Sequence, residues 1–155
     1  MTHPFRKTSA LALAAAIGLG WTGTAGAQTD PAALPPVQQS GSVDYLTGGI
    51  GVDESTSIDA VSRQWPLTLV FGTAGGRMKA DYLADVQVSV RDQLGRTALD
   101  VKADGPYLLA RLSPGTYDVA AEFAGRTVHR KVVIRPGHPV RSVLLWPASV
   151  ADASS

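Results

Sequence analysis

From Pro66 onward, apolar and polar positions alternate in short segments that are separated by turn residues. In one segment Tyr117, Val119 and Ala121 alternate with Asp118. This spacing of two places the apolar side chains on one face of a β-strand. Seven segments have this pattern, and we expect strands at residues 67–71, 86–90, 97–102, 107–112, 116–123, 127–135 and 140–146. Short strands with frequent turn signals are typical of an antiparallel β-sandwich.

Residues 105–123 predict a β-hairpin. Apolar positions alternate on both sides of a central Ser-Pro-Gly-Thr sequence at 113–116. Pro114 would fix φ at the second position of a type II turn, and Gly115 would supply the positive φ that the third position needs. We therefore expect strands 107–112 and 116–123 to be neighbours in one sheet.

The chain before Pro66 has a different period. Ile58, Val61 and Trp65 are spaced as on one face of a helix, so a short helix is expected within residues 55–64. Asp53 or Ser55 would cap its start and Pro66 would end it. Residues 43–65 are thus interpreted as a glycine-rich turn and a short helix in front of the sandwich domain, residues 66–146.

The first 27 residues have the features of a signal peptide. Arg6 and Lys7 precede an apolar run at 10–19, and the small residues Ala25 and Ala27 form a cleavage motif before Gln28. The alternative is an uncleaved N-terminal anchor, although the run is shorter than the about 20 residues that a membrane-spanning helix needs. Cleavage predicts a periplasmic or secreted protein without a membrane span.

Composition and charge predict which segments are unstructured and which kinds of partner are not expected. Residues 28–42 are rich in Pro, Ala and Gln and predict a flexible leader, and residues 147–155 predict a disordered tail. Without the two basic residues of the signal peptide, 12 basic residues face 13 acidic ones. No basic cluster indicates a nucleic-acid partner, and the chain contains no cysteine for a disulfide.

Several motifs resemble the carboxypeptidase regulatory-like domain. They are the run from Tyr82 to Gly95 with its V-x-V-x-D pattern, Gly105-Pro-Tyr107, Leu112-Ser-Pro-Gly-Thr-Tyr-Asp-Val119, and Gly125-Arg126. The resemblance covers residues 66–146. It implies an all-β fold, a seven-stranded antiparallel β-sandwich of the transthyretin (prealbumin) type. Members of this family act mostly as non-catalytic appendages, so the resemblance also implies a role without catalysis.

Catalytic and metal-binding patterns are weak. The histidines after the signal peptide are His129, on the polar side of its strand, and His138, in a turn, and both are expected at the surface. They match no zinc spacing, and we expect no metal and no cofactor. Hydrolases of transthyretin shape end in a Tyr-Arg-Gly-Ser motif, which this chain lacks.

The glycine-rich segment before the helix allows two interpretations. Gly48, Gly49 and Gly51 could cradle an anion at the helix N-terminus. However, Asp53 and Glu54 place negative charge there and fit capping and the helix dipole instead. The segment is therefore interpreted as a tight turn that docks the helix, with a binding surface as the alternative.

Aromatic side chains offer a further route to function, because carbohydrate-binding sandwiches stack sugars on exposed rings. Trp65, Tyr82, Tyr107 and Trp146 are the candidates. Trp65 is expected to hold the helix to the core and Trp146 to lie inside it, whereas Tyr107 could be exposed.

Together these features predict a non-catalytic binding or interaction module of the cell envelope, whose partner is an envelope protein or a glycan. The alternatives are a carbohydrate-binding module and, as a third reading, a transthyretin-shaped hydrolase. No catalytic residue is assigned. The candidate binding surface comprises Gly48, Gly49, Gly51, Asp53, Glu54, Tyr107, Arg111 and His129.

Overall fold

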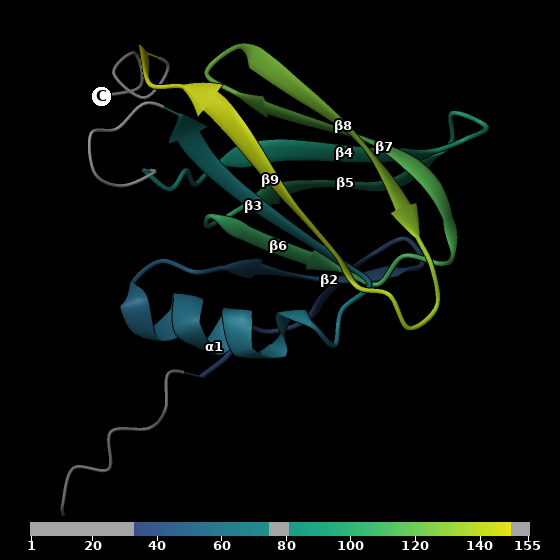
Figure 1. Ribbon diagram of the computed structural model, residues 1–155, viewed down its shortest axis with the longest axis horizontal. Helices are drawn as coiled ribbons and strands as arrows, with labels where there is room; N and C mark the ends of the chain where they lie inside the picture. Colours follow the sequence, from purple (N-terminus) through teal and green to yellow (C-terminus); the bar gives the residue numbers. More distant parts are fainter. Residues whose placement is uncertain (1–32, 75–80, 150–155) are drawn as a thin grey trace, which may run out of the picture.

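The computed structural model describes residues 33–74 and 81–149, and this part of the chain is mainly β-strand (Figure 1). The signal peptide and its cleavage site lie outside the described residues. In chain order the elements are β1 (Gln38–Ser40), β2 (Val43–Gly48), α1 (Val52–Ser62), β3 (Leu67–Ala74), β4 (Val86–Asp92), β5 (Thr97–Ala103), β6 (Tyr107–Ala110), β7 (Gly115–Phe123), β8 (Arg126–Ile134) and β9 (Val140–Pro147).

The strands form two sheets. The first has the order β1-β2-β6-β3-β9 and the second the order β5-β4-β7-β8. The expected mostly-β chain with one short helix is confirmed. The expected number of seven strands is wrong for the described residues, because β1 and β2 add two more. β2 pairs with both β1 and β6, and its last three residues are all buried, so it lacks the alternation that reveals a one-sided strand.

The main core lies between the two sheets. Tyr117, Val119 and Ala121 of β7 are buried as their spacing predicts, while Asp118 and Glu122 are exposed. The core continues through alternate residues of β3, β4, β5, β8 and β9, including Leu69, Phe71, Val86, Val88, Val90, Leu99, Val101, Val132, Ile134, Leu144 and Trp146.

The expected hairpin at residues 105–123 does not form. β6 lies in the first sheet and β7 in the second, so residues 111–114 carry the chain from one sheet to the other. Gly115 has a φ of 158° and pairs with Ile134 as the first residue of β7. A type II turn needs a φ of about +80° at this position. The prediction failed because a Pro-Gly pair sets only a preference for certain local backbone dihedral angles. It does not determine whether the strands before and after it pair with each other.

Helix α1 covers the outer face of the first sheet, next to β2 and β6 (Figure 1). Ile58 and Trp65 form a second apolar cluster with Leu46, Val70, Tyr107 and Leu109. Ile58 and Val61 therefore lie on the inner face of the helix as predicted, whereas Trp65 follows the end of α1 at Ser62 and packs into the same cluster. β6 is buried on both faces, towards the main core and towards the helix.

The helix begins earlier than expected. Its N-cap is Gly51, without a side-chain hydrogen bond to the helix end, and its C-cap is Arg63. Asp53 and Ser55 lie inside the first turn, so neither caps the helix. The backbone N–H of Ser55 donates to the Gly51 carbonyl oxygen and closes that turn.

One pair of strands is parallel, which corrects the expectation of a fully antiparallel fold. β3 and β9 run in the same direction, with Leu67 opposite Val140 and Ala74 opposite Pro147. Residues 135–139 lead from the edge strand β8 of the second sheet to β9 at the edge of the first. A hairpin within one sheet would make the strands that it joins antiparallel. The turn before β9 joins two different sheets, so it does not set the direction of β9 relative to β3.

Order also extends beyond the expected sandwich boundary at Pro66. Gln38–Ser40 form β1 and turn through Gly41, whose φ is 60°, into β2. This part of residues 28–42 is therefore paired strand and not a flexible leader. Residues 43–65 are likewise integral to the first sheet and its outer cluster.

Candidate functional site

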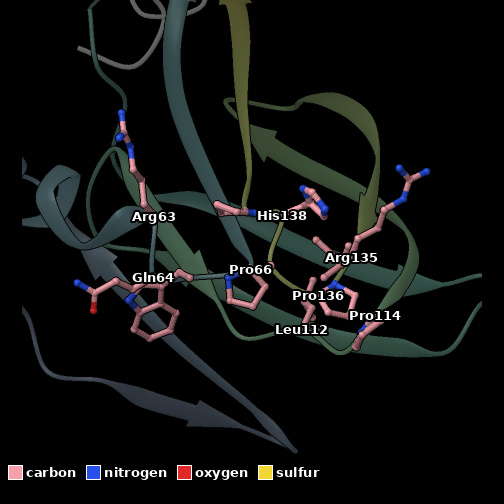
Figure 2. Close-up of a pocket in the computed structure, with 12 residues that line it drawn as sticks. Arg63, Gln64, Pro66, Leu112, Pro114, Arg135, Pro136 and His138 are labelled. Carbon is pink, nitrogen blue, oxygen red and sulfur yellow. The ribbon is translucent and has the colours of Figure 1, made fainter.

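Three connections meet at one end of the two sheets and line an open pocket of about 380 Å³, here called the end pocket. They are the links from α1 to β3, from β6 to β7 and from β8 to β9. Figure 2 shows Pro66, Leu112, Pro114 and Pro136 gathered around its centre. The full lining is Arg63, Gln64, Trp65, Pro66, Leu112, Pro114, Ile134, Arg135, Pro136, Gly137, His138 and Pro139.

The turn between β8 and β9 shapes one wall of the end pocket. The His138 N–H donates to the Arg135 carbonyl oxygen at 3.2 Å, and Gly137 between them has a φ of 71°. Pro136 fixes φ at the preceding position, so this Arg-Pro-Gly-His sequence satisfies the pattern of a type II turn. The turn directs the Arg135 and His138 segment against the α1–β3 link.

Trp65 forms an apolar part of this pocket and is itself almost fully buried, with 5% of its surface exposed. The guanidinium carbon of Arg111 lies 4.3 Å from the centre of a Trp65 ring, a cation–π contact. Arg111 is held there by its backbone N–H, which donates to the Asp44 carbonyl oxygen. One face of the indole is thus already occupied.

The rim of the end pocket carries positive charge. Arg63 and Arg135 stand on opposite sides of it, and their side chains extend outward from the ring of prolines (Figure 2). Both are exposed, and neither makes an ion pair with any residue in the described ranges. No carboxylate is among the lining residues. The pocket therefore combines an apolar floor with unpaired guanidinium groups.

A second pocket of about 380 Å³, the side pocket, adjoins the first between α1 and the start of β9. Arg63 and Pro139 line both. Here one arginine is paired, because Arg141 forms an ion pair with Asp59, whereas Arg63 has no ion-pair partner among the described residues. Partial burial alone would lower the pKa of Arg141, but the hydrogen bond and charge of Asp59 raise it above its usual value.

The glycine-rich segment is closed by packing and not open to an anion. The Gly49 N–H donates to Glu54 Oε1 at 2.8 Å. A side chain at Gly48 would overlap Glu54 and Pro35, and one at Gly49 would overlap the Tyr107 ring. The interpretation as a tight turn that docks the helix describes this geometry, and the carboxylate of Glu54 occupies the place of an external anion.

The remaining predicted surface residues are not gathered in one place. Gly51 and Asp53 are exposed at the start of α1, whereas Arg111 lies at the far end of β6 over Trp65. His129 is exposed on β8 in the second sheet, where it pairs with Ala120. Of the eight predicted residues, Gly48, Gly49, Glu54 and Tyr107 are brought together by the fold.

The expected exposure of Tyr107 is wrong, because only 5% of its surface is accessible. Its ring packs beneath Gly49 and 6.2 Å from the ring of Tyr82. Burial raises the pKa of Tyr107, and the neighbouring Tyr82 raises it further. Trp146 is fully buried and donates to the Arg126 carbonyl oxygen, as its expected place in the core requires. Of the four aromatic candidates for a sugar platform, only Tyr82 is exposed, at 55%.

Sequence reasoning missed the end pocket. Arg63 falls within the expected helix at 55–64 and Arg135 at the end of the expected strand 127–135, and neither is singled out by its local pattern. His138 is expected at the surface, where it lies. Four prolines at turns around one buried tryptophan were the available signal: Pro66, Pro114, Pro136 and Pro139. Their meeting depends on which connections lie at the same end of the two sheets.

Within the described ranges, no group of three or more His, Asp or Glu side chains is placed to hold a metal ion. No helix there is long and apolar enough to cross a membrane. No protein-family model matches the chain, and none of the curated proteins compared with it is significantly similar. The resemblance to the carboxypeptidase regulatory-like domain therefore rests on the motifs alone.

Proposed function

We propose that this protein is a non-catalytic binding module of the cell envelope, located in the periplasm or outside the cell, and that the end pocket is its binding site. The observation that carries the proposal is the end pocket itself. Its floor is apolar, and Arg63 and Arg135 on its rim have no ion-pair partner among the described residues. Apolar pockets with a few convergent polar groups are the usual form of binding sites.

The assignment as non-catalytic is supported by the side chains that line the end pocket. Covalent catalysis needs a nucleophile such as Ser, Thr, Cys, Lys or a carboxylate beside a general base. Among the described residues, the lining of the end pocket contains none of these nucleophiles. A pocket formed by connections on a rigid scaffold suits capture of a partner.

We also propose a prealbumin-like fold of the carboxypeptidase regulatory-like type. The motifs that carry this resemblance fall on β4, on the first half of β7 and on the connections before β6, before β7 and before β8. The envelope location rests on the signal-peptide pattern and its cleavage motif before Gln28. Intact mass of protein released from the periplasm tests the location, since a mature chain that starts at Gln28 supports export and one that retains residues 1–27 contradicts it.

Site-specific photo-crosslinking in cells tests the binding role. A benzoylphenylalanine is placed at Gln64, an exposed lining residue of the end pocket, and in a matched variant at Glu122, exposed on the second sheet. We expect a discrete crosslinked product from position 64 that an excess of wild-type protein suppresses. Products that are identical from both positions, or no product from position 64, would contradict a binding role for the pocket.

A further inference from the structure

We infer that the end pocket binds a peptide segment in which carboxylate side chains flank a bulky apolar side chain. The inference rests on the proposed function and adds the chemistry of the ligand.

The floor of the end pocket selects for an apolar group. Trp65, Leu112 and Ile134 are buried beneath the surface and contribute to the lining. The prolines around them have no backbone N–H, so these positions offer no main-chain donor to a polar ligand. A pocket of about 380 Å³ lies at the small end of the range for ligand sites. It accommodates an aromatic or branched side chain together with a short stretch of backbone.

The rim selects for negative charge. Arg63 and Arg135 lie on opposite sides of the floor (Figure 2). With Arg111 over Trp65, three guanidinium groups lie around this end, and no carboxylate lines the pocket. Guanidinium groups pair with carboxylates in a bidentate geometry. The separation of the two rim arginines by the floor matches a ligand with a carboxylate on each side of an apolar group.

The combination favours a peptide over other anions. A free phosphate or a nucleic-acid backbone would pair with the arginines but leave the exposed Pro114, Pro136 and Pro139 of the lining in water, which loses the free energy of apolar burial. A sugar would lack an exposed aromatic face to stack on, because Trp65 has only 5% of its surface exposed and its indole is in contact with Arg111. An acidic peptide with a leucine or phenylalanine satisfies both parts of the site.

Chemical-shift mapping with synthetic peptides tests the inference. The probe is acetyl-Asp-Glu-Phe-Asp-Glu-amide, added to the isotope-labelled protein without its signal peptide. Two matched controls are the analogue with Asn and Gln in place of Asp and Glu, and the analogue with Ala in place of Phe. We expect shifts at residues 63–66, 112–114 and 134–139. Affinity should be at least about tenfold weaker for each control, because the Asn and Gln analogue loses charged hydrogen bonds and the Ala analogue loses apolar burial.

Charge reversal separates recognition from a structural role. The double variant Arg63→Glu with Arg135→Glu should lose the acidic probe and bind the analogue with Lys in place of Asp and Glu. Both side chains are exposed and have no ion pair among the described residues, so the thermal midpoint should stay near that of the wild type. Arg91→Glu, exposed on β4 of the second sheet, is the control and should leave acidic-peptide affinity unchanged.

Each contrary result overturns the inference. These results are equal binding of acidic and neutral peptides, shifts outside the end pocket, no shifts at all, or the same shifts produced by inorganic phosphate or by phosphatidylglycerol vesicles. If position 64 gave a crosslinked product in cells but the acidic probe caused no chemical-shift changes, the peptide as ligand would be wrong and the binding role would stand. If position 64 gave no crosslinked product, the proposed function would be wrong as well.

Discussion

The backbone of Gly49 lies so close to the ring of Tyr107 that a Cβ at position 49 would overlap the Cδ2 atom of that ring. Gly49 also has a φ of 94° and donates its N–H to Glu54 Oε1. The turn before α1 is therefore a packing device, which seats the ring of a β6 residue beneath the chain that leads into the helix.

A matched pair of glycine substitutions measures this packing. Gly49 and Gly51 have φ values of 94° and 93°, but only Gly49 has atoms in the way of a side chain. Gly51→Ala should lower the free energy of unfolding by about 1–3 kcal/mol, the cost of a positive φ. Gly49→Ala should cost about 1–3 kcal/mol more, because of overpacking against Tyr107. Urea denaturation measures both values, and equal losses would mean that the ring moves aside freely.

The two adjacent carboxylates before the helix should behave differently. Glu54→Ala leaves the part-buried Gly49 N–H without its acceptor, which should cost about 1–3 kcal/mol. Glu54→Gln keeps an acceptor oxygen and should recover much of that loss. Asp53 is exposed, and Asp53→Ala should change stability by less than about 0.5 kcal/mol. If thermal melts gave the same midpoint for Asp53→Ala and Glu54→Ala, the hydrogen bond between the Gly49 N–H and Glu54 would not contribute to stability.

Consecutive leucines of β6 report on the two sides of the first sheet. Leu108 faces the main core and Leu109 faces the helix cluster, and both are fully buried. Each change to alanine should cost about 2–5 kcal/mol. Leu109→Ala should also increase hydrogen exchange in α1 at low denaturant, because the helix loses a packing partner. If Leu109→Ala left the free energy of unfolding nearly unchanged, the packing of α1 over Leu109 would be contradicted. β6 would then bury only one face, as its alternation predicted.

Stability should fall at alkaline pH because of two buried tyrosines. Burial is the main cause that raises the pKa of Tyr107 and of Tyr117 in the folded protein. Above the usual tyrosine pKa of about 10, the unfolded chain releases protons that the folded chain keeps, so the free energy of unfolding decreases as pH rises. Tyr117→Phe and Tyr107→Phe should each make this decrease smaller in urea titrations between about pH 8 and 11. If the free energy of unfolding fell equally with pH in the wild type and in both variants, neither tyrosine would be the cause of the decrease.

Part of the fold was predictable from local pattern. The alternation in β4 and β7 identified Val86, Val88 and Val119 as core residues, and the helical spacing of Ile58 and Val61 identified the inner face of α1. These two predictions were correct because each segment buries only one face. Burial of one face makes apolar residues recur in the sequence with the period of the strand or helix.

Other features followed from long-range contacts. The sequence around Ser113–Thr116 has the local preferences of a turn, yet β6 and β7 pair with strands in different sheets. β6 is buried on both faces, so the one-sided burial expected from its alternation does not describe it, and the last three residues of β2 are all buried. Tyr107 was expected at the surface because its neighbours alternate, but α1 and the glycine turn cover it.

The sequence by itself determined the β-rich character of the chain, most strand positions and the apolar face of the helix, because these depend on residues two to seven apart. Only the tertiary structure decided the sheet to which each strand belongs, the parallel pairing of β3 with β9, and the end pocket. The pocket joins residues 63–66, 112–114 and 134–139, whose proximity is set by strand pairing and by packing of the helix on the sheet. No local pattern contains the information that brings Arg63 and Arg135 to opposite sides of one apolar floor.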